Sequence, residues 1–90
     1  MRFFDVYIHL GADLTVLKKS VIAVINLEEV PPMERNVTEF MNEEDNRGRL
    51  QYISDDLPQS VVITDEGTYV TPLSCQVLRK RLQSELYSEM

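Results

Sequence analysis

The chain has 90 residues, and its 15 acidic against 9 basic residues give a formal net charge of −6 at pH 7. This length lies below the roughly 100–200 residues of a usual domain, so we predict one domain over residues 1–90 without a large enclosed active site. A content of 43% hydrophobic and 27% charged residues is typical of a folded protein and excludes a disordered segment. A core this small leaves a monomer marginally stable, which favours a homo-oligomer.

The single cysteine, Cys75, has no partner for an intramolecular disulfide, which suits a reducing compartment. The residues around Phe3 and Phe4 contain neither the apolar stretch nor the cleavage site of a signal peptide. The longest apolar run, Val21–Ile25, is much shorter than a membrane span. We therefore expect a cytoplasmic protein that is not embedded in a membrane.

The first part of the chain predicts three strands. Apolar and polar residues alternate from Phe4 to Leu10, which indicates a strand with one face on a core. After a turn at Gly11, the β-branched run Leu14–Leu17 can return antiparallel to it. Lys18, Lys19 and Ser20 then predict a bend. The nearly continuous apolar run Val21–Leu27 predicts a third strand that is covered on both faces.

The middle of the chain predicts a helix. It would begin just after Pro31 and Pro32, since proline is compatible with the first helical position. Its apolar stripe consists of residues spaced by one and two helical turns, namely Met33, Val37, Phe40 and Met41. Gly48 is expected to end it.

The last part predicts three more strands and a terminal helix. Leu50–Ser54 resembles a strand, and Ser60–Thr64 and Thr68–Thr71 form the clearest hairpin signal, with Gly67 at a position that tolerates positive φ. Ser74 is a suitable N-cap. The terminal helix carries a spaced apolar stripe of Val77, Leu78, Leu82 and Leu86. The predicted fold is α+β, a mostly antiparallel sheet of about six short strands with two helices.

No residue pattern indicates catalysis, a metal or a cofactor. His9 is the only imidazole, and no nucleophile can be assigned to it, so a structural or surface histidine is the better interpretation. Cys75 likewise lacks a second histidine as a base. The acids from Glu43 onward do not fit a calcium loop, because Arg47 and Ser54 stand where oxygen ligands and a final glutamate are required. The three glycines are too scattered for a phosphate-binding loop. We predict that the protein is not an enzyme.

The charge is unevenly distributed. Between Glu28 and Asp56 nine acids face three bases, while the rest of the chain holds six residues of each sign. An acidic middle segment on a neutral frame leaves room for a basic face elsewhere. Seven of the nine bases occur in three groups, namely Lys18 with Lys19, Arg47 with Arg49, and Arg79-Lys80-Arg81. Three consecutive residues on a helix point about 100° apart, so the last group cannot face one ligand together.

Several ordered segments resemble the extracellular matrix regulatory protein family. The segments that carry the resemblance are Tyr7–Asp13, Ser20–Ile25, Ser60–Ser74 and Leu78–Leu82. The Tyr7-Ile8-His9-Leu10-Gly11 opening is closer to the RemB-type branch. The resemblance spans about Val6 to Leu82, which is nearly the whole chain.

The resemblance implies a small, cytoplasmic, non-enzymatic bacterial protein, similar to RemA-type members that bind DNA as ring-shaped homo-oligomers and regulate biofilm matrix genes. RemA-type members carry an arginine-rich segment before the strand that matches Ser60–Thr64, whereas this chain has Asp55-Asp56-Leu57-Pro58-Gln59. Acids at that place would repel phosphates. The candidate DNA-binding residues are therefore Lys18 and Lys19, with Arg47 and Arg49 matching a basic stretch after the first helix more loosely.

Two functions from different classes remain open. The first is a DNA-binding transcription regulator that acts as a ring-like homo-oligomer without a cofactor. The second is an oligomeric protein-interaction module that has kept the scaffold and lost DNA binding, with a protein partner that the sequence does not identify.

Overall fold

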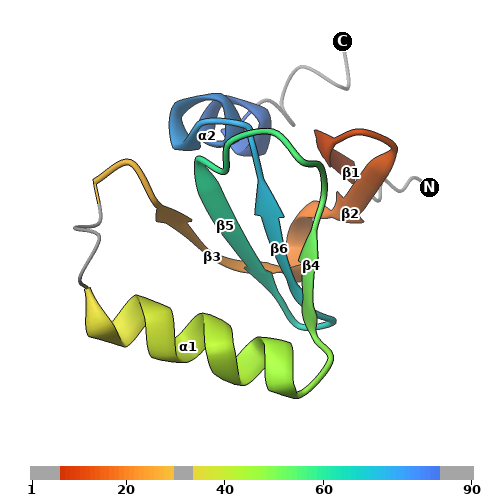
Figure 1. The fold of residues 1–90 in the computed structure, drawn as a ribbon. Helices are drawn as coiled ribbons and strands as arrows, with labels where there is room; N and C mark the ends of the chain where they lie inside the picture. The colour runs from red at the N-terminus through yellow and green to blue at the C-terminus, as the bar shows by residue number, and fades with distance from the viewer. Residues whose placement is uncertain (1–6, 30–33, 84–90) are drawn as a thin grey trace, which may run out of the picture.

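The structure is a computed structural model, and it describes residues 7–29 and 34–83 of the chain (Figure 1). The strands are β1 (Tyr7–Gly11), β2 (Leu14–Leu17), β3 (Val21–Asn26), β4 (Leu50–Tyr52), β5 (Ser60–Thr64) and β6 (Thr68–Thr71). The helices are η1 (Lys18–Ser20, a 3₁₀ turn), α1 (Arg35–Asn46) and α2 (Cys75–Gln83). No helix in these described ranges is long and apolar enough to cross a membrane.

The six strands form two sheets. The β1–β2 hairpin is a two-stranded antiparallel sheet, and the other four strands pair in the order β3-β5-β6-β4. The prediction of a mostly antiparallel sheet is correct for β3, β5 and β6, but β4 runs parallel to β6, so the four-stranded sheet is mixed. The parallel pair follows from chain order, because α1 carries the chain back across the sheet before β4 begins (Figure 1).

One face of the four-stranded sheet, here called the hairpin face, carries the main core. The hairpin and α2 cover it (Figure 1). Its fully buried side chains come from the hairpin, from β5 and from α2, and they are Ile8, Leu10, Val62 and Leu78. The hydroxyl of Thr71 donates to the Leu10 carbonyl at 2.5 Å, which ties the hairpin to β6. The alternation predicted up to Leu10 is thus confirmed from Tyr7 onward, while Phe4 lies outside the described residues.

The opposite face is covered by α1, which lies along the bottom of the sheet in Figure 1. Val37, Phe40 and Met41 are half-buried, as predicted, whereas Met33 lies outside the described residues. Gly48 follows the helix with a φ of 73°, a left-handed conformation that suits a helix end, so its predicted role is confirmed.

Two local predictions about turns have different outcomes. Ser74 caps α2, since its Oγ accepts the Val77 N–H at 3.1 Å. The β5–β6 hairpin is present, but Gly67 has no positive φ. A side chain there would instead place its Cβ 3.2 Å from the Arg49 carbonyl oxygen, so close approach of the backbone is what favours glycine at this position.

The prediction that the strand beginning at Val21 is covered on both faces is wrong for the single chain. β3 is an edge strand of its sheet, with a bulge between Val21 and Ala23. Ile22 in this bulge is 67% exposed, and Ala23 is exposed as well. The apolar run therefore forms the edge strand of the sheet, and its residues Ile22 and Ala23 are exposed to solvent.

Candidate nucleic-acid interface

Lys18 and Lys19 lie in η1, the turn that joins the hairpin to the four-stranded sheet. Lys19 is exposed, and no described residue forms an ion pair with it. Lys18 differs, because its Nζ atom is buried and has no hydrogen-bond partner among the described residues. Of the two lysines, only Lys19 has its ammonium positioned for an external phosphate.

Removing the buried ammonium of Lys18 should stabilise the fold. A buried charged group without a hydrogen bond carries a desolvation cost that an apolar side chain of similar length does not have. We expect Lys18→Met to raise the melting temperature by several degrees, which corresponds to about 1 kcal/mol in a domain of this size. Thermal unfolding beside Lys19→Met, which should leave the melting temperature unchanged, checks this. A lower melting temperature for Lys18→Met would show that the ammonium has a stabilising partner.

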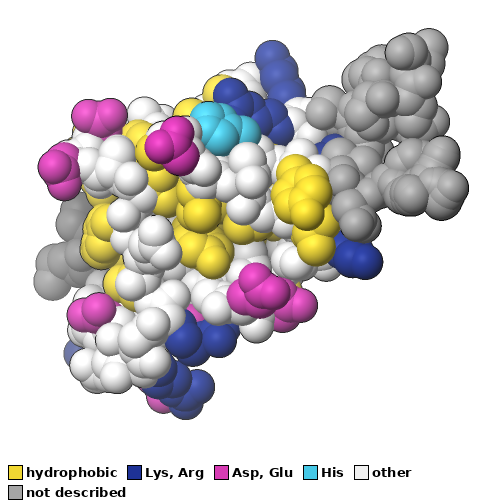
Figure 2. All heavy atoms as spheres, turned by 90° about the vertical axis from the view of Figure 1, so that its right-hand side faces the viewer, with side chains coloured by type: hydrophobic (Ala, Val, Ile, Leu, Met, Phe, Trp, Pro, Cys, Tyr) yellow, Lys and Arg dark blue, Asp and Glu magenta, His cyan; other side chains and the backbone are white. Residues whose placement is uncertain are grey.

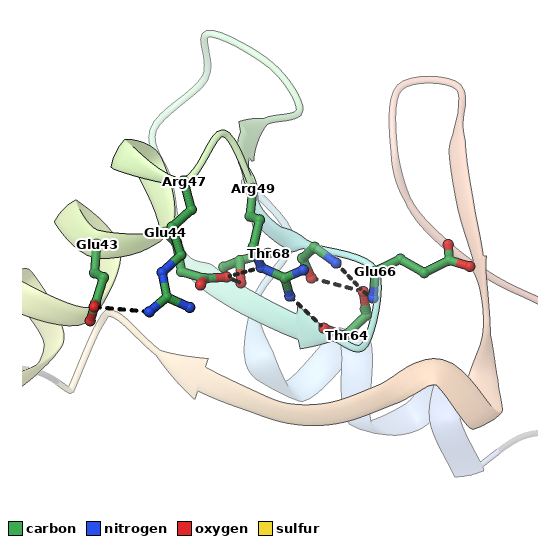
Figure 3. Close-up of polar contacts among 8 residues, drawn as sticks. Glu43, Glu44, Arg47, Arg49, Thr64, Glu66 and Thr68 are labelled. Carbon is green, nitrogen blue, oxygen red and sulfur yellow. Dashed lines mark hydrogen bonds and ion pairs between the residues drawn. The ribbon is translucent and has the colours of Figure 1, made fainter.

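Arg47 and Arg49 are both engaged by carboxylates at the end of α1 (Figure 3). Arg47 pairs with Glu43 at 3.2 Å on the exposed surface of the helix. Arg49 Nε donates to Glu44 Oε1 at 3.2 Å, and its Nη2 donates to the Thr64 carbonyl at 3.5 Å. Arg49 therefore joins α1 to the turn between β5 and β6.

Glu44 is the centre of this network and was not among the predicted site residues. It lies on the inner stripe of α1, is buried, and also accepts the Thr68 hydroxyl at 2.5 Å. The Thr68 hydrogen bond, supported by Arg49, lowers the pKa of Glu44 below its ordinary value, although burial acts in the opposite direction. A charged Glu44 keeps Arg49 directed into the protein instead of toward a ligand.

The terminal helix carries the third basic group. Arg79 and Lys80 are exposed, whereas Arg81 donates from Nη1 to the His9 carbonyl at 2.8 Å. The imidazole Nε2 of His9 lies 2.6 Å from the Ala12 carbonyl oxygen, which fits the structural role predicted for it. Figure 2 shows the basic side chains of one face in separate groups at its edges, with hydrophobic and acidic side chains between the groups. This face of a single copy thus has no continuous basic track.

One groove of the structure lies close to η1. It lies between the hairpin and the β5–β6 turn, has a volume of about 380 Å³, and is lined by Tyr7, Leu14, Thr15, Val16, Leu17, Ser20, Thr64, Glu66 and Tyr69. These residues include neither a histidine, a cysteine nor a lysine. Within residues 7–29 and 34–83, no three His, Cys, Asp or Glu side chains are grouped to hold a metal ion.

The segment before β5 is the most exposed apolar feature of the described chain. Leu57 is 79% exposed, and the exposed carboxylates of Asp55 and Asp56 precede it. Asp55 and Asp56, which replace the arginine-rich segment of RemA-type members, thus lie on the surface, where their charge can act on a partner.

Comparison with known proteins agrees with the resemblance. The model of the RemA-like family, described as extracellular matrix regulatory protein A-like, matches residues 7–82. The chain is also 30% identical over 77 residues to extracellular matrix regulatory protein B of Bacillus subtilis (strain 168), covering 86% of this chain and 90% of that protein. The matched range contains both sheets and η1. The chain therefore belongs to the RemA-like family of extracellular matrix regulatory proteins.

Proposed function

We propose that this protein is a non-enzymatic, DNA-binding transcription regulator of extracellular matrix genes that acts in the cytoplasm as a ring-like homo-oligomer. Family membership over residues 7–82 is the observation that supports it most strongly, since the family is one of regulatory proteins. Within this chain, the exposed Lys19 at the junction of hairpin and sheet is the residue we assign to phosphate contact. A phosphate contact positions the duplex and carries no sequence information by itself.

Oligomerisation is necessary for this proposal because of the charge. One copy carries a net charge of −6, and its Arg47 and Arg49 are held by Glu43 and Glu44. A ring built by one repeated interface would place Lys19 at regular intervals around its circumference. Duplex binding would then depend on several equivalent contacts, none of which is strong alone.

Salt-dependent titration of a duplex with the purified oligomer tests the proposal. Each phosphate contact makes the logarithm of affinity fall by about 0.9 per decade of salt. We expect a steep slope for the natural protein, and loss of binding for Lys19→Glu at protein concentrations where this variant is still oligomeric. Lys80→Glu is the matched control, because it makes the same charge change at an exposed lysine of α2 and should reduce binding much less.

A protein-interaction module is the second candidate. The exposed side chain of Leu57, which lies between Asp55-Asp56 and β5, favours it. It would be preferred if the natural oligomer retained no duplex even near about 50 mM salt, where phosphate contacts are strong. Replacing Asp55 and Asp56 by arginine separates the two cases further. Stronger duplex binding by that variant would place this segment at the duplex, and no change would place it elsewhere.

A further inference from the structure

Among the described residues, no strand pairs with the outer edge of β3. β3 is the terminal strand in the order β3-β5-β6-β4. The Leu27 N–H donates to the Gln59 carbonyl at 3.0 Å, in register with the Ile25–Val61 pair. Because hydrogen-bonding direction alternates along an antiparallel strand, Ile25 and Ala23 bond toward β5. The backbone groups of Val24 therefore point away from the sheet.

This edge carries a bulge near its start, but it lacks the charges and prolines that most often prevent strand pairing. Between Val21 and Asn26 there is no charged residue and no proline. Ile22 is 67% exposed in the bulge, and Ala23 is exposed beside it. An exposed apolar edge strand of six residues is a template for another strand.

The charges at the two ends of β3 are complementary to each other. Lys18 and Lys19 precede the strand, and Glu28 and Glu29 follow it. Lys19, Glu28 and Glu29 are all exposed. Two antiparallel copies of the strand bring the basic end of one beside the acidic end of the other at both ends. A parallel arrangement would instead bring like charges together, which is destabilising.

We propose that two copies of this chain pair through antiparallel β3 strands around a two-fold axis at Val24. A hydrogen-bonded pair requires outward backbone groups on both strands, and Val24 opposite its own copy meets this condition. This antiparallel arrangement brings η1 of one copy, which holds Lys19, to the end of the strand that Glu28 and Glu29 of the partner subunit follow, and the same contact forms again by symmetry. The pairing also covers Ile22, which explains why the run from Val21 has the composition of a covered strand.

This interface does not depend on DNA binding. It is isologous, with the same surface on both subunits, and so differs from the repeated head-to-tail interface that closes a ring. Lys19 takes part in both proposals. If both proposals are correct, Lys19 cannot contact a phosphate while it forms an ion pair with Glu29 of the partner subunit.

Charge reversal and its compensation test the pairing. We expect Lys19→Glu and Glu29→Lys each to weaken the self-association measured by sedimentation at low salt about tenfold, since each creates two like-charge contacts per interface. The double variant Lys19→Glu with Glu29→Lys exchanges the charges and should restore association. Lys80→Glu and Glu39→Lys, both at exposed helical positions, are controls that should associate normally.

A second variant tests the strand itself. Ile22→Lys places a charge on the exposed bulge without removing a ladder hydrogen bond, and it should lower the oligomer mass while far-ultraviolet circular dichroism stays unchanged. A double charge variant as weakly associated as the single ones would overturn the proposal. An Ile22→Lys protein with the mass of the natural one would overturn it as well. Because mass is the readout, absence of duplex binding would count against the proposed regulator function alone.

Discussion

Replacement of Glu44 by alanine should lower the melting temperature by roughly 10 °C. Glu44 is buried and accepts hydrogen bonds from Thr68 and Arg49, so its removal leaves a fully buried hydroxyl and a guanidinium without their acceptor. Loss of such a partner costs about 2 kcal/mol. In a domain of this size each kcal/mol corresponds to roughly 4–8 °C.

Glu43→Ala is the matched control for this prediction. Glu43 precedes Glu44 in α1 and pairs with Arg47, but both side chains of that pair are exposed. An exposed helical ion pair contributes only about 0.3–0.5 kcal/mol. Equal losses of melting temperature in the two variants would show that the Glu44 network does not hold α1 on the sheet.

The same carboxylate predicts a pH dependence of stability. The pKa of Glu44 is lower in the folded protein than in the unfolded chain, mainly through the Thr68 hydrogen bond. Its contribution is therefore fully present above the pKa of the unfolded chain and is lost as the pH falls through the lower pKa of the folded state. Glu44→Gln keeps an acceptor without a titrating charge. The difference in unfolding free energy between natural protein and Glu44→Gln should thus shrink between pH 6 and pH 3, and a constant difference would contradict the assignment.

Glu44 also shows what the sequence could indicate about this site. It follows Val37 by seven residues and Phe40 by four, which places a carboxylate on the apolar stripe of the helix. An acid at such a position signals a buried, paired group. The identity of its partners could not be predicted, because Thr68 comes from β6 and Arg49 from the segment after the helix, and only the packed fold brings them together.

For the strands, too, the sequence predicted the features that depend on neighbouring residues and missed those that depend on the packed fold. Alternation and turn residues correctly predicted the β5–β6 hairpin and the β1–β2 pair, since both are made by neighbouring segments. The direction of β4 depends on the packing of α1, which returns the chain across the sheet, and no local pattern encodes that packing. The apolar run of β3 was correctly predicted as a strand, but the described residues leave Ile22 and Ala23 in it exposed. Under the pairing proposed above, a partner subunit would supply the missing contact.

The same reasoning applies to the basic residues. Lys18, Lys19, Arg47 and Arg49 stand out in the sequence as charges, yet the structure places them in different surroundings. Arg47 and Arg49 have carboxylate partners, and the ammonium of Lys18 is buried. Only the position of Lys19 at an exposed turn leaves its charge available in one copy.

Replacement of Leu10 by alanine should remove a large part of the folding free energy. The β1–β2 hairpin forms a sheet of its own, so within the part of the chain that the structure describes no strand ladder joins it to the four-stranded sheet. Its attachment depends on the buried Ile8 and Leu10 and on the Thr71 hydrogen bond to the Leu10 carbonyl. Leu10 is fully buried, and a leucine-to-alanine change in a core costs roughly 3–5 kcal/mol. A chain of this length has only about 5–13 kcal/mol in total.

Urea unfolding of Leu10→Ala beside Leu57→Ala measures this effect. Leu57 is 79% exposed, so the same chemical change there should alter the unfolding free energy by no more than about 0.5 kcal/mol. Since β2 leads directly into η1, a loosened hairpin would also release Lys19 from its fixed position. We therefore expect Leu10→Ala, under conditions where it remains folded, to weaken duplex binding although Leu10 touches no ligand. If Leu10→Ala unfolded at the same urea concentration as Leu57→Ala, the hairpin would be no part of the core, and η1 would have no rigid support.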